Sequence, residues 1–167
     1  MIDIETLEFA ELKEENIPDL LAIYNYYVLN TTATFHEKPL ALSEFRELVV
    51  FADSKYATYV IKDAGKICGY ILLTQFKKRE AYDRTGEITI YLKNGSSGKG
   101  IGKAALSYVE RKAREQGFHT LMATICGENE RSIYLFVRNG YKKCAHLQEV
   151  GRKFGRWLDI VVYQKLL

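Results

Sequence analysis

A short segment dense in glycine and serine, residues 93–100, limits more than any other feature what this chain can fold into. It reads Lys-Asn-Gly-Ser-Ser-Gly-Lys-Gly, and such a run cannot continue a strand. The residues before it, Glu87 to Leu92, alternate like a strand, and from Ile101 apolar residues recur at helical spacing until Gly117. The chain is therefore predicted to contain a strand, a glycine-rich loop and a helix in that order.

Periodicity predicts a mixed α/β domain around this unit. Upstream we expect an edge strand at residues 2–5, a helix at 17–28 with Pro18 in its first turn, and a short helix with Ser43 as its N-cap. The other expected elements are strands at 56–62, 66–74 and 118–126, a helix at 130–138, and final strands at 141–150 and 157–166. No repeat or linker interrupts the chain, so residues 1–167 are interpreted as one domain.

Composition and charge exclude several functional classes. The apolar runs fall well short of the ~20 residues that cross a bilayer, and the acidic start lacks the features of a secretion signal. The 24 basic residues are dispersed and nearly balanced by 21 acidic ones, which is not typical of a nucleic-acid binder. Cys68, Cys126 and Cys144 lack the spacing of a metal site. We therefore expect a cytoplasmic protein with no metal and no nucleic-acid or membrane partner.

A glycine-rich turn that feeds a helix offers unpaired N–H groups and a positive dipole end, which suit a phosphate. A nucleotide-binding P-loop is excluded, because Ala104 lacks the required hydroxyl and Ser97 replaces the upstream glycine. Gly100 to Ala105 satisfies a loose dinucleotide fingerprint, but it follows a hairpin and no acid lies near position 120. The segment can also be a plain turn at the start of a helix. A third phosphate-binding interpretation rests on a resemblance to a known family.

Residues 97–102, Ser-Gly-Lys-Gly-Ile-Gly, resemble the pyrophosphate loop of the GNAT superfamily of acetyl-CoA-dependent N-acetyltransferases. Ser97 stands where that superfamily has Gln or Arg. The segment from Asn129 to Tyr141 resembles the next motif of the superfamily, an Asn-led helix that closes in Gly and an aromatic residue. Two linked motifs in the expected order are much more specific than either one alone.

A narrower resemblance, to the phosphinothricin N-acetyltransferase-like family, covers nearly the whole chain. It rests on residues 23–25 with 31–35, on Arg-Glu-Ala-Tyr at 79–82 with Thr85 and Glu87, and on Gly-Arg-Lys-Phe-Gly-Arg-Trp-Leu-Asp at 151–159. The resemblance implies the GNAT fold, an α/β (α+β) class with a twisted, mixed, mostly antiparallel sheet, splayed central strands and helices on both faces. It also implies a homodimer that acetylates small amino-acid analogues such as phosphinothricin, methionine sulfoximine or methionine sulfone.

Glu87 is the candidate catalytic base. An amine attacks a thioester only when neutral, so an ammonium acceptor must lose a proton in the site. Glu87 should face away from Ile88 and Ile90 on the strand that enters the glycine-rich loop. Alternation alone favours an outward, solvated glutamate. The match to the family's proposed base position favours the functional interpretation instead.

The remaining site residues follow from the resemblance. Arg79 matches the family's substrate-binding arginine, whose planar fork suits a carboxylate or phosphinate. The pocket positions matched are Phe35, Tyr82 and Thr85. The residues expected to bind acetyl-CoA are Ile90, Leu92, Ser97, Gly98, Lys99, Gly100, Ile101, Gly102, Lys103, Asn129 and Ser132.

The proton donor is the open point of the chemistry. The position that carries a Tyr or His in relatives is Phe136, and Tyr134 should point about 200° away around the helix. The thiolate then leaves as the anion or is protonated by another group or water. Two alternatives to a small-molecule acetyltransferase stay open. One is an acyl-CoA-binding sensing module with weak catalysis, and the other is an N-acetyltransferase of a protein N-terminus or polyamine.

Overall fold

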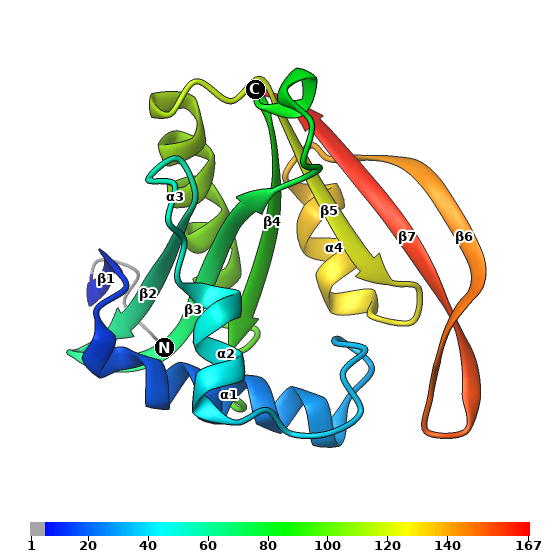
Figure 1. Cartoon of the computed structure of the whole chain (residues 1–167), viewed down its shortest axis with the longest axis horizontal. Coiled ribbons are helices and arrows are strands. Elements are labelled where there is room, and N and C mark those ends of the chain that lie inside the picture. The colour runs from blue at the N-terminus through cyan, green and yellow to red at the C-terminus, as the bar shows by residue number, and fades with distance from the viewer. Residues whose placement is uncertain (1–5) are drawn as a thin grey trace.

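The computed structural model describes residues 6–167 and contains a seven-stranded mixed sheet with α-helices on both faces (Figure 1). The strands are β1 (Leu7–Glu11), β2 (Ala57–Asp63), β3 (Lys66–Gln75), β4 (Thr85–Leu92), β5 (Thr120–Cys126), β6 (Lys142–Lys153) and β7 (Arg156–Leu166). The helices are α1 (Ile17–Asn30), α2 (Leu42–Val49), α3 (Ile101–Glu115) and α4 (Glu130–Arg138), with two 3-10 turns, η2 (Glu14–Asn16) and η3 (Glu80–Tyr82).

The central strands of the sheet separate. The strand order is β1-β2-β3-β4-β5-β7-β6, and every neighbouring pair is antiparallel except β4 and β5. These two parallel strands pair only from Thr85 opposite Thr120 to Glu87 opposite Met122. Beyond that point they diverge (Figure 1). The predicted mixed, mostly antiparallel sheet with splayed central strands and flanking helices is confirmed.

Two apolar cores hold the layers together. One lies between the sheet and helices α3 and α4, and includes Leu106, Phe136 and Ile88. The other lies between the sheet and helices α1 and α2, and includes Tyr91. Since side chains alternate along a strand, Ile88 and Tyr91 on β4 enter opposite cores. This alternation also places Glu87 on the face of the sheet that α1 and α2 cover.

Two local expectations differ from the structure, one lies outside the described residues, and one strand was not predicted. Helix α2 begins at Leu42, so Ser43 is not its N-cap; the cap is Ala41, whose backbone N–H donates to the Glu44 carboxylate at 2.7 Å. A carboxylate in the first turn can supply the capping acceptor in place of a hydroxyl. The edge strand predicted at residues 2–5 lies outside the described residues, and the strand β1 (Leu7–Glu11) was not predicted. The last two strands extend closer to their shared turn than expected. Strand β6 ends at Lys153 and not at residue 150, and β7 starts at Arg156 and not at residue 157.

Candidate active site

A cleft of about 1380 Å³ opens where β4 and β5 separate. Its walls come from β4, the end of β5, the start of α3 and helix α4. The end of α1, the loop that follows it and the turn between β6 and β7 also border it. This volume exceeds the ~300–1,000 Å³ of common small-molecule pockets, so the cleft can hold a long ligand.

The glycine-rich loop forms one end of the cleft with a backbone that only glycine adopts readily. Gly98 and Gly100 have φ angles of +80° and +82°, in the left-handed region. Gly100 is the N-cap of α3, and the first intrahelical bond runs from Ala104 N–H to the Gly100 carbonyl at 3.1 Å. The N–H groups of residues 101–103 therefore have no partner within the helix.

The charges along α3 favour an anion at this end. Its first turn holds no acidic residue, while Lys112 and Arg114 lie in its last turn, where cations complement the helix dipole. Unpaired N–H groups and the positive end of the dipole thus face the same end of the cleft. The arrangement is suited to a phosphate or pyrophosphate.

The structure brings most of the predicted cofactor residues to the cleft. Those that border it are Ile90, Leu92, Ser97, Gly98, Gly100, Gly102, Lys103, Asn129 and Ser132. Lys99 and Ile101 do not border it, and the Ile101 side chain is fully buried in the core. Ile101 can therefore contribute only its backbone N–H. The Asn129 side chain accepts a hydrogen bond from the Ser132 N–H at 3.2 Å and thereby caps α4 at the cleft wall.

Glu87 is the last residue of β4 that pairs with β5, at the apex where the two strands begin to separate. It does not itself border the cleft, whereas the next residue, Ile88, does. Burial raises the pKa of its carboxyl above the ordinary 4.5, and a hydrogen bond with the Thr124 hydroxyl opposes part of that rise. Thr124 and the neighbouring Ile88 both border the cleft. A half-buried carboxylate with a raised pKa at the apex is a stronger base than an ordinary surface glutamate.

Helix α4 offers no ionisable group at the position expected for a proton donor. Phe136 is 3% exposed and packs against Tyr141, with 4.9 Å between the ring centroids. Tyr134 is 66% exposed, and the Arg138 guanidinium lies 5.9 Å from its ring. The two side chains differ in burial as the helical spacing predicts, although both residues border the cleft.

None of the four residues predicted to bind the acceptor borders the cleft. Phe35 packs against the backbone of Gly151, in strand β6. Arg79 is exposed and precedes η3, and the Tyr82 ring lies 6.0 Å from that of Phe76. Thr85 opens β4 two residues before Glu87. Arg79, Tyr82 and Thr85 thus lie along the connection that leads into Glu87.

Sequence reasoning missed several residues that the fold brings to the cleft. Tyr27 donates its hydroxyl to the Leu92 carbonyl at 2.6 Å, and burial raises the pKa of that hydroxyl. Glu128, Phe154 and Arg156 border the cleft from the β5–α4 and β6–β7 connections. Glu128 directly precedes Asn129, and Phe154 and Arg156 lie in the 151–159 segment that carries the family resemblance, so these positions were the available signals. Tyr27 comes from a distant segment that local periodicity does not connect to the cleft.

The described residues, 6–167, contain no cluster of three or more His, Cys, Asp or Glu side chains placed to hold a metal ion. Within that same range, no helix is long and apolar enough to cross a membrane.

Comparison with known proteins identifies relatives along nearly the whole chain. The family model of the acetyltransferase (GNAT) domain matches residues 10–162. An L-methionine sulfoximine/L-methionine sulfone acetyltransferase of Pseudomonas paraeruginosa is 36% identical, over 89% of this chain and 88% of that protein. A phosphinothricin N-acetyltransferase of Streptomyces coelicolor is 32% identical, over 92% of each.

A solved structure has the same arrangement of elements. The phosphinothricin acetyltransferase of Sinorhizobium meliloti, in complex with acetyl-CoA, superposes with a TM-score of 0.91 at 32% identity. The match covers 97% of this chain and 89% of that chain. Its bound acetyl-CoA supports the assignment of a large ligand cleft in this fold.

Proposed function

The chain belongs to the GNAT family of acetyl-CoA-dependent acetyltransferases, and from that premise we propose that it acetylates the amino group of small amino-acid analogues. The acceptor class is that of methionine sulfoximine, methionine sulfone and phosphinothricin, which the names of its relatives report. The observation that carries the proposal is Glu87, a half-buried carboxylate at the apex where β4 and β5 separate, next to a cleft with an anion-binding end.

The cofactor is proposed to lie along the cleft with its pyrophosphate on the glycine-rich loop. The backbone N–H groups of residues 97–102 and the dipole of α3 would hold the phosphates. Among the described residues, β4 has no strand partner on its β5 side beyond Glu87, so its backbone groups there can bind a ligand. The thioester would then lie near the apex.

Acetyl transfer is proposed to occur by direct attack. Glu87 takes one proton from the acceptor ammonium, and the neutral nitrogen attacks the thioester carbonyl. The nitrogen of the tetrahedral intermediate then gives a second proton to water, and the carbon–sulfur bond breaks to release the coenzyme A thiolate. Because Phe136 cannot donate a proton, the thiolate leaves as the anion or takes its proton from water or another group.

Arg79 is proposed to bind the acceptor carboxylate at the rim of the site. Its guanidinium offers a planar pair of donors that a lysine cannot reproduce. A partly exposed charged hydrogen bond of this kind contributes roughly 1.5 kcal/mol, or about tenfold in kcat/KM. Phe35, Tyr82 and Thr85 would complete that side of the pocket.

The acceptor class is tested by measuring free-thiol release with a panel of amines. The panel contains methionine sulfoximine, methionine sulfone, their decarboxylated amines, a polyamine and a peptide with a free N-terminus. We expect the two amino-acid analogues to give the highest kcat/KM. A higher kcat/KM for the polyamine or the peptide would contradict the proposed acceptor class but not the acetyltransferase activity.

Arg79→Lys tests whether the guanidinium of Arg79 binds the carboxylate of the acceptor. We expect kcat/KM for methionine sulfone to fall about tenfold, with an unchanged KM for acetyl-CoA, because the phosphate-binding loop is a separate element. The decarboxylated amine should show no such loss. Equal losses on both acceptors would mean that Arg79 supports its loop and does not read the carboxylate.

The enzyme is further proposed to be a cytoplasmic homodimer. Support for the compartment comes from Cys68, Cys126 and Cys144, which are all free thiols. Support for the dimer comes from Leu147 and Trp157, large apolar side chains exposed on the β6–β7 hairpin.

A further inference from the structure

The proposed base does not meet the cleft directly. Glu87 does not border the cleft, and its carboxyl forms a hydrogen bond with the side chain of Thr124, which does border it. A base must come within hydrogen-bond reach of the proton that it removes, either directly or through one intervening group. The proposed transfer therefore needs a group that carries the acceptor proton to Glu87.

Thr124 is exposed on a strand that is otherwise buried. Every other residue of β5 (Thr120–Cys126) is buried. The strand pairs with β7 along its whole length, where Thr124 lies opposite Val162, but its pairing with β4 ends at Met122. The separation of the two central strands therefore leaves the Thr124 side chain uncovered, and this side chain borders the cleft that opens there.

The register of the sheet places Thr124 and Glu87 on one face. Glu87 lies opposite Met122, and Thr124 follows Met122 by two residues, so the three side chains share a face. The alternate residues, Ala123 and Ile125, enter the core beneath α3 and α4 instead. A diagonal neighbour on the next strand lies within reach of a long side chain such as glutamate. The hydroxyl of Thr124 is thus placed to connect the carboxyl with the cleft.

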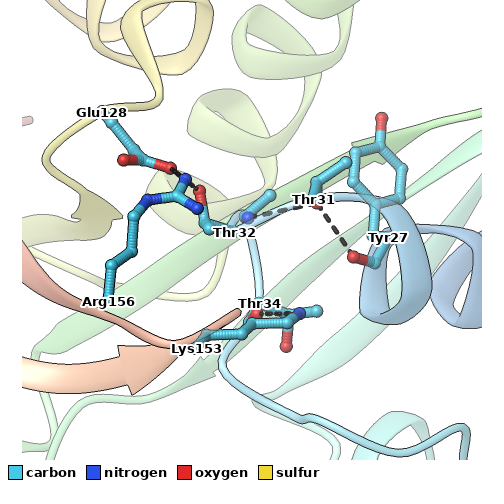
Figure 2. Close-up of polar contacts among 8 residues, drawn as sticks. Tyr27, Thr31, Thr32, Thr34, Glu128, Lys153 and Arg156 are labelled. Carbon is cyan, nitrogen blue, oxygen red and sulfur yellow. Dashed lines mark hydrogen bonds and ion pairs between the residues drawn. The ribbon is translucent and has the colours of Figure 1, made fainter.

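Two other threonine hydroxyls at the cleft are engaged in the loop after α1. Thr31 donates to the Tyr27 carbonyl at 2.9 Å, and Thr32 donates to the Glu128 carboxylate at 2.6 Å (Figure 2). Both bonds join this loop to neighbouring elements, so these hydroxyl protons have structural acceptors. Thr124 is bonded instead to the carboxylate that the proposed chemistry uses.

A threonine hydroxyl has the chemistry that a proton relay requires. It can accept a hydrogen bond from an ammonium group while it donates its own proton to a carboxylate. Threonine is also branched at Cβ, which restricts rotation about χ1 and limits the directions in which the hydroxyl can point. Valine has nearly the same shape, but its side chain can neither accept nor donate a proton.

We propose that Thr124 is a catalytic residue that relays the acceptor proton to Glu87. This inference rests on the proposed acetyl transfer. The ammonium N–H gives its proton to the Thr124 oxygen while the Thr124 O–H gives its own proton to the Glu87 carboxylate, so the hydroxyl is restored without becoming charged. The neutral amine then attacks the thioester. After the product leaves, Glu87 loses its proton to water along the same path in reverse.

Thr124→Val tests the relay, because it removes the hydroxyl and keeps the shape. We expect kcat/KM for methionine sulfone, measured on the plateau above the acidic limb, to fall about tenfold. Thr124→Ser keeps a hydroxyl and should stay within about threefold of the parent. The KM for acetyl-CoA and the melting temperature should change little in either variant, since the glycine-rich loop is a separate element.

The plateau is the decisive quantity. The hydrogen bond from Thr124 lowers the pKa of Glu87, so its loss by itself would move the acidic limb to higher pH. A hydroxyl that only tunes this pKa would leave the plateau of kcat/KM unchanged. A hydroxyl that carries the proton is required at every pH, so its removal lowers the plateau.

Thr74→Val is the matched control. Thr74 lies opposite Glu87 on β3, the other neighbouring strand, and its hydroxyl donates to the Glu87 backbone carbonyl at 3.4 Å. It does not border the cleft. The same loss of a hydroxyl beside the same glutamate should therefore leave the plateau unchanged.

Three results would overturn the relay. They are a Thr124→Val plateau equal to that of the parent, a loss of equal size in Thr74→Val, and a Thr124→Ser variant no more active than Thr124→Val. Thr124→Ala also lacks the hydroxyl, and it should be less active than Thr124→Ser. This comparison decides the question if Thr124→Val does not fold.

Failure of the relay and failure of the proposed function are distinguishable. A parent enzyme that acetylates none of the panel amines refutes the proposed function, and the relay then falls with it. An active parent with an unchanged plateau in Thr124→Val refutes the relay alone.

Discussion

Glu87 combines two properties that the proposed chemistry needs from one residue, a position at the apex where β4 and β5 separate and a raised pKa. A base must be unprotonated to act, so activity should fall as the pH drops through the pKa of Glu87. Because burial raises that pKa above 4.5, the acidic limb of kcat/KM should begin at a higher pH than for an ordinary glutamate. Glu87→Gln should lower kcat about 10²-fold or more at neutral pH and remove this limb.

The matching measurements are a pH–rate profile and calorimetry with acetyl-CoA. Binding of acetyl-CoA should survive in Glu87→Gln, since the phosphate-binding loop is distant from the substitution. The melting temperature at pH 7 should be equal or higher. The sign follows because the folded pKa lies above the unfolded one, so the carboxylate is less stable in the folded chain than in the unfolded chain. A variant whose profile overlays that of the parent would make Glu87 a structural residue.

Phe136 occupies the expected donor position with a buried ring, and its removal should act through packing alone. Phe136→Leu leaves part of its volume empty against Tyr141, so stability should fall by roughly 1–2 kcal/mol. The pH–rate profile should keep every ionisation of the parent. Tyr134→Phe should change neither property, because its ring is largely exposed. Loss of the basic limb in Tyr134→Phe would identify that hydroxyl as the missing donor.

At the scale of elements, the glycine-rich loop allows a matched pair of substitutions. Gly95 and Gly98 have similar φ angles, +85° and +80°, and an added Cβ at either would meet nothing within 4 Å. Only Gly98 borders the cleft. Gly95→Ala and Gly98→Ala should therefore lose similar stability, about 1 kcal/mol each. By calorimetry, Gly98→Ala alone should weaken acetyl-CoA binding, by about tenfold. Equal affinities of the two variants for acetyl-CoA would mean that the glycine-rich loop does not bind the cofactor.

Gly102 is a less direct probe of the same loop. A Cβ there would lie 3.2 Å from the Leu135 side chain on α4. Gly102→Val would therefore disturb the packing of α3 against α4 as well as any ligand contact. Weakened acetyl-CoA binding is still expected in this variant. An unchanged affinity in folded Gly102→Val would argue strongly against the phosphate assignment.

Local patterns predicted the centre of the fold well. The strand, glycine-rich loop and helix from Glu87 onward are confirmed, because alternation, glycine content and 3.6-residue spacing are all local signals. The same alternation predicted the face on which Glu87 lies. It could not predict the burial that raises its pKa, which depends on neighbouring elements. Thr32, Glu128 and Arg156 come from three widely separated segments of the chain, and no periodicity in one sequence connects such segments.

At the scale of the whole molecule, the β6–β7 hairpin presents an apolar surface to solvent. Trp157 on β7 is 61% exposed and Leu147 on β6 is 47% exposed, and exposed apolar surface of this kind marks association sites. We expect a homodimer in solution by analytical ultracentrifugation. Trp157→Glu should shift it toward monomer, because a charge would be buried without a partner. Leu29→Asn, on α1, should leave the dimer intact. A monomeric parent would contradict the proposed assembly.

The central claim is that this cleft transfers an acetyl group from coenzyme A to an amine, and product stoichiometry tests it most directly. The purified enzyme is incubated with acetyl-CoA and methionine sulfone, and released thiol and N-acetylated product are quantified together by absorbance and mass spectrometry. The account predicts equal amounts of both, growing with time and absent without enzyme. Thiol release without the amide, or tight acetyl-CoA binding without either product for any amine of the panel, would contradict it and leave an acyl-CoA-binding module.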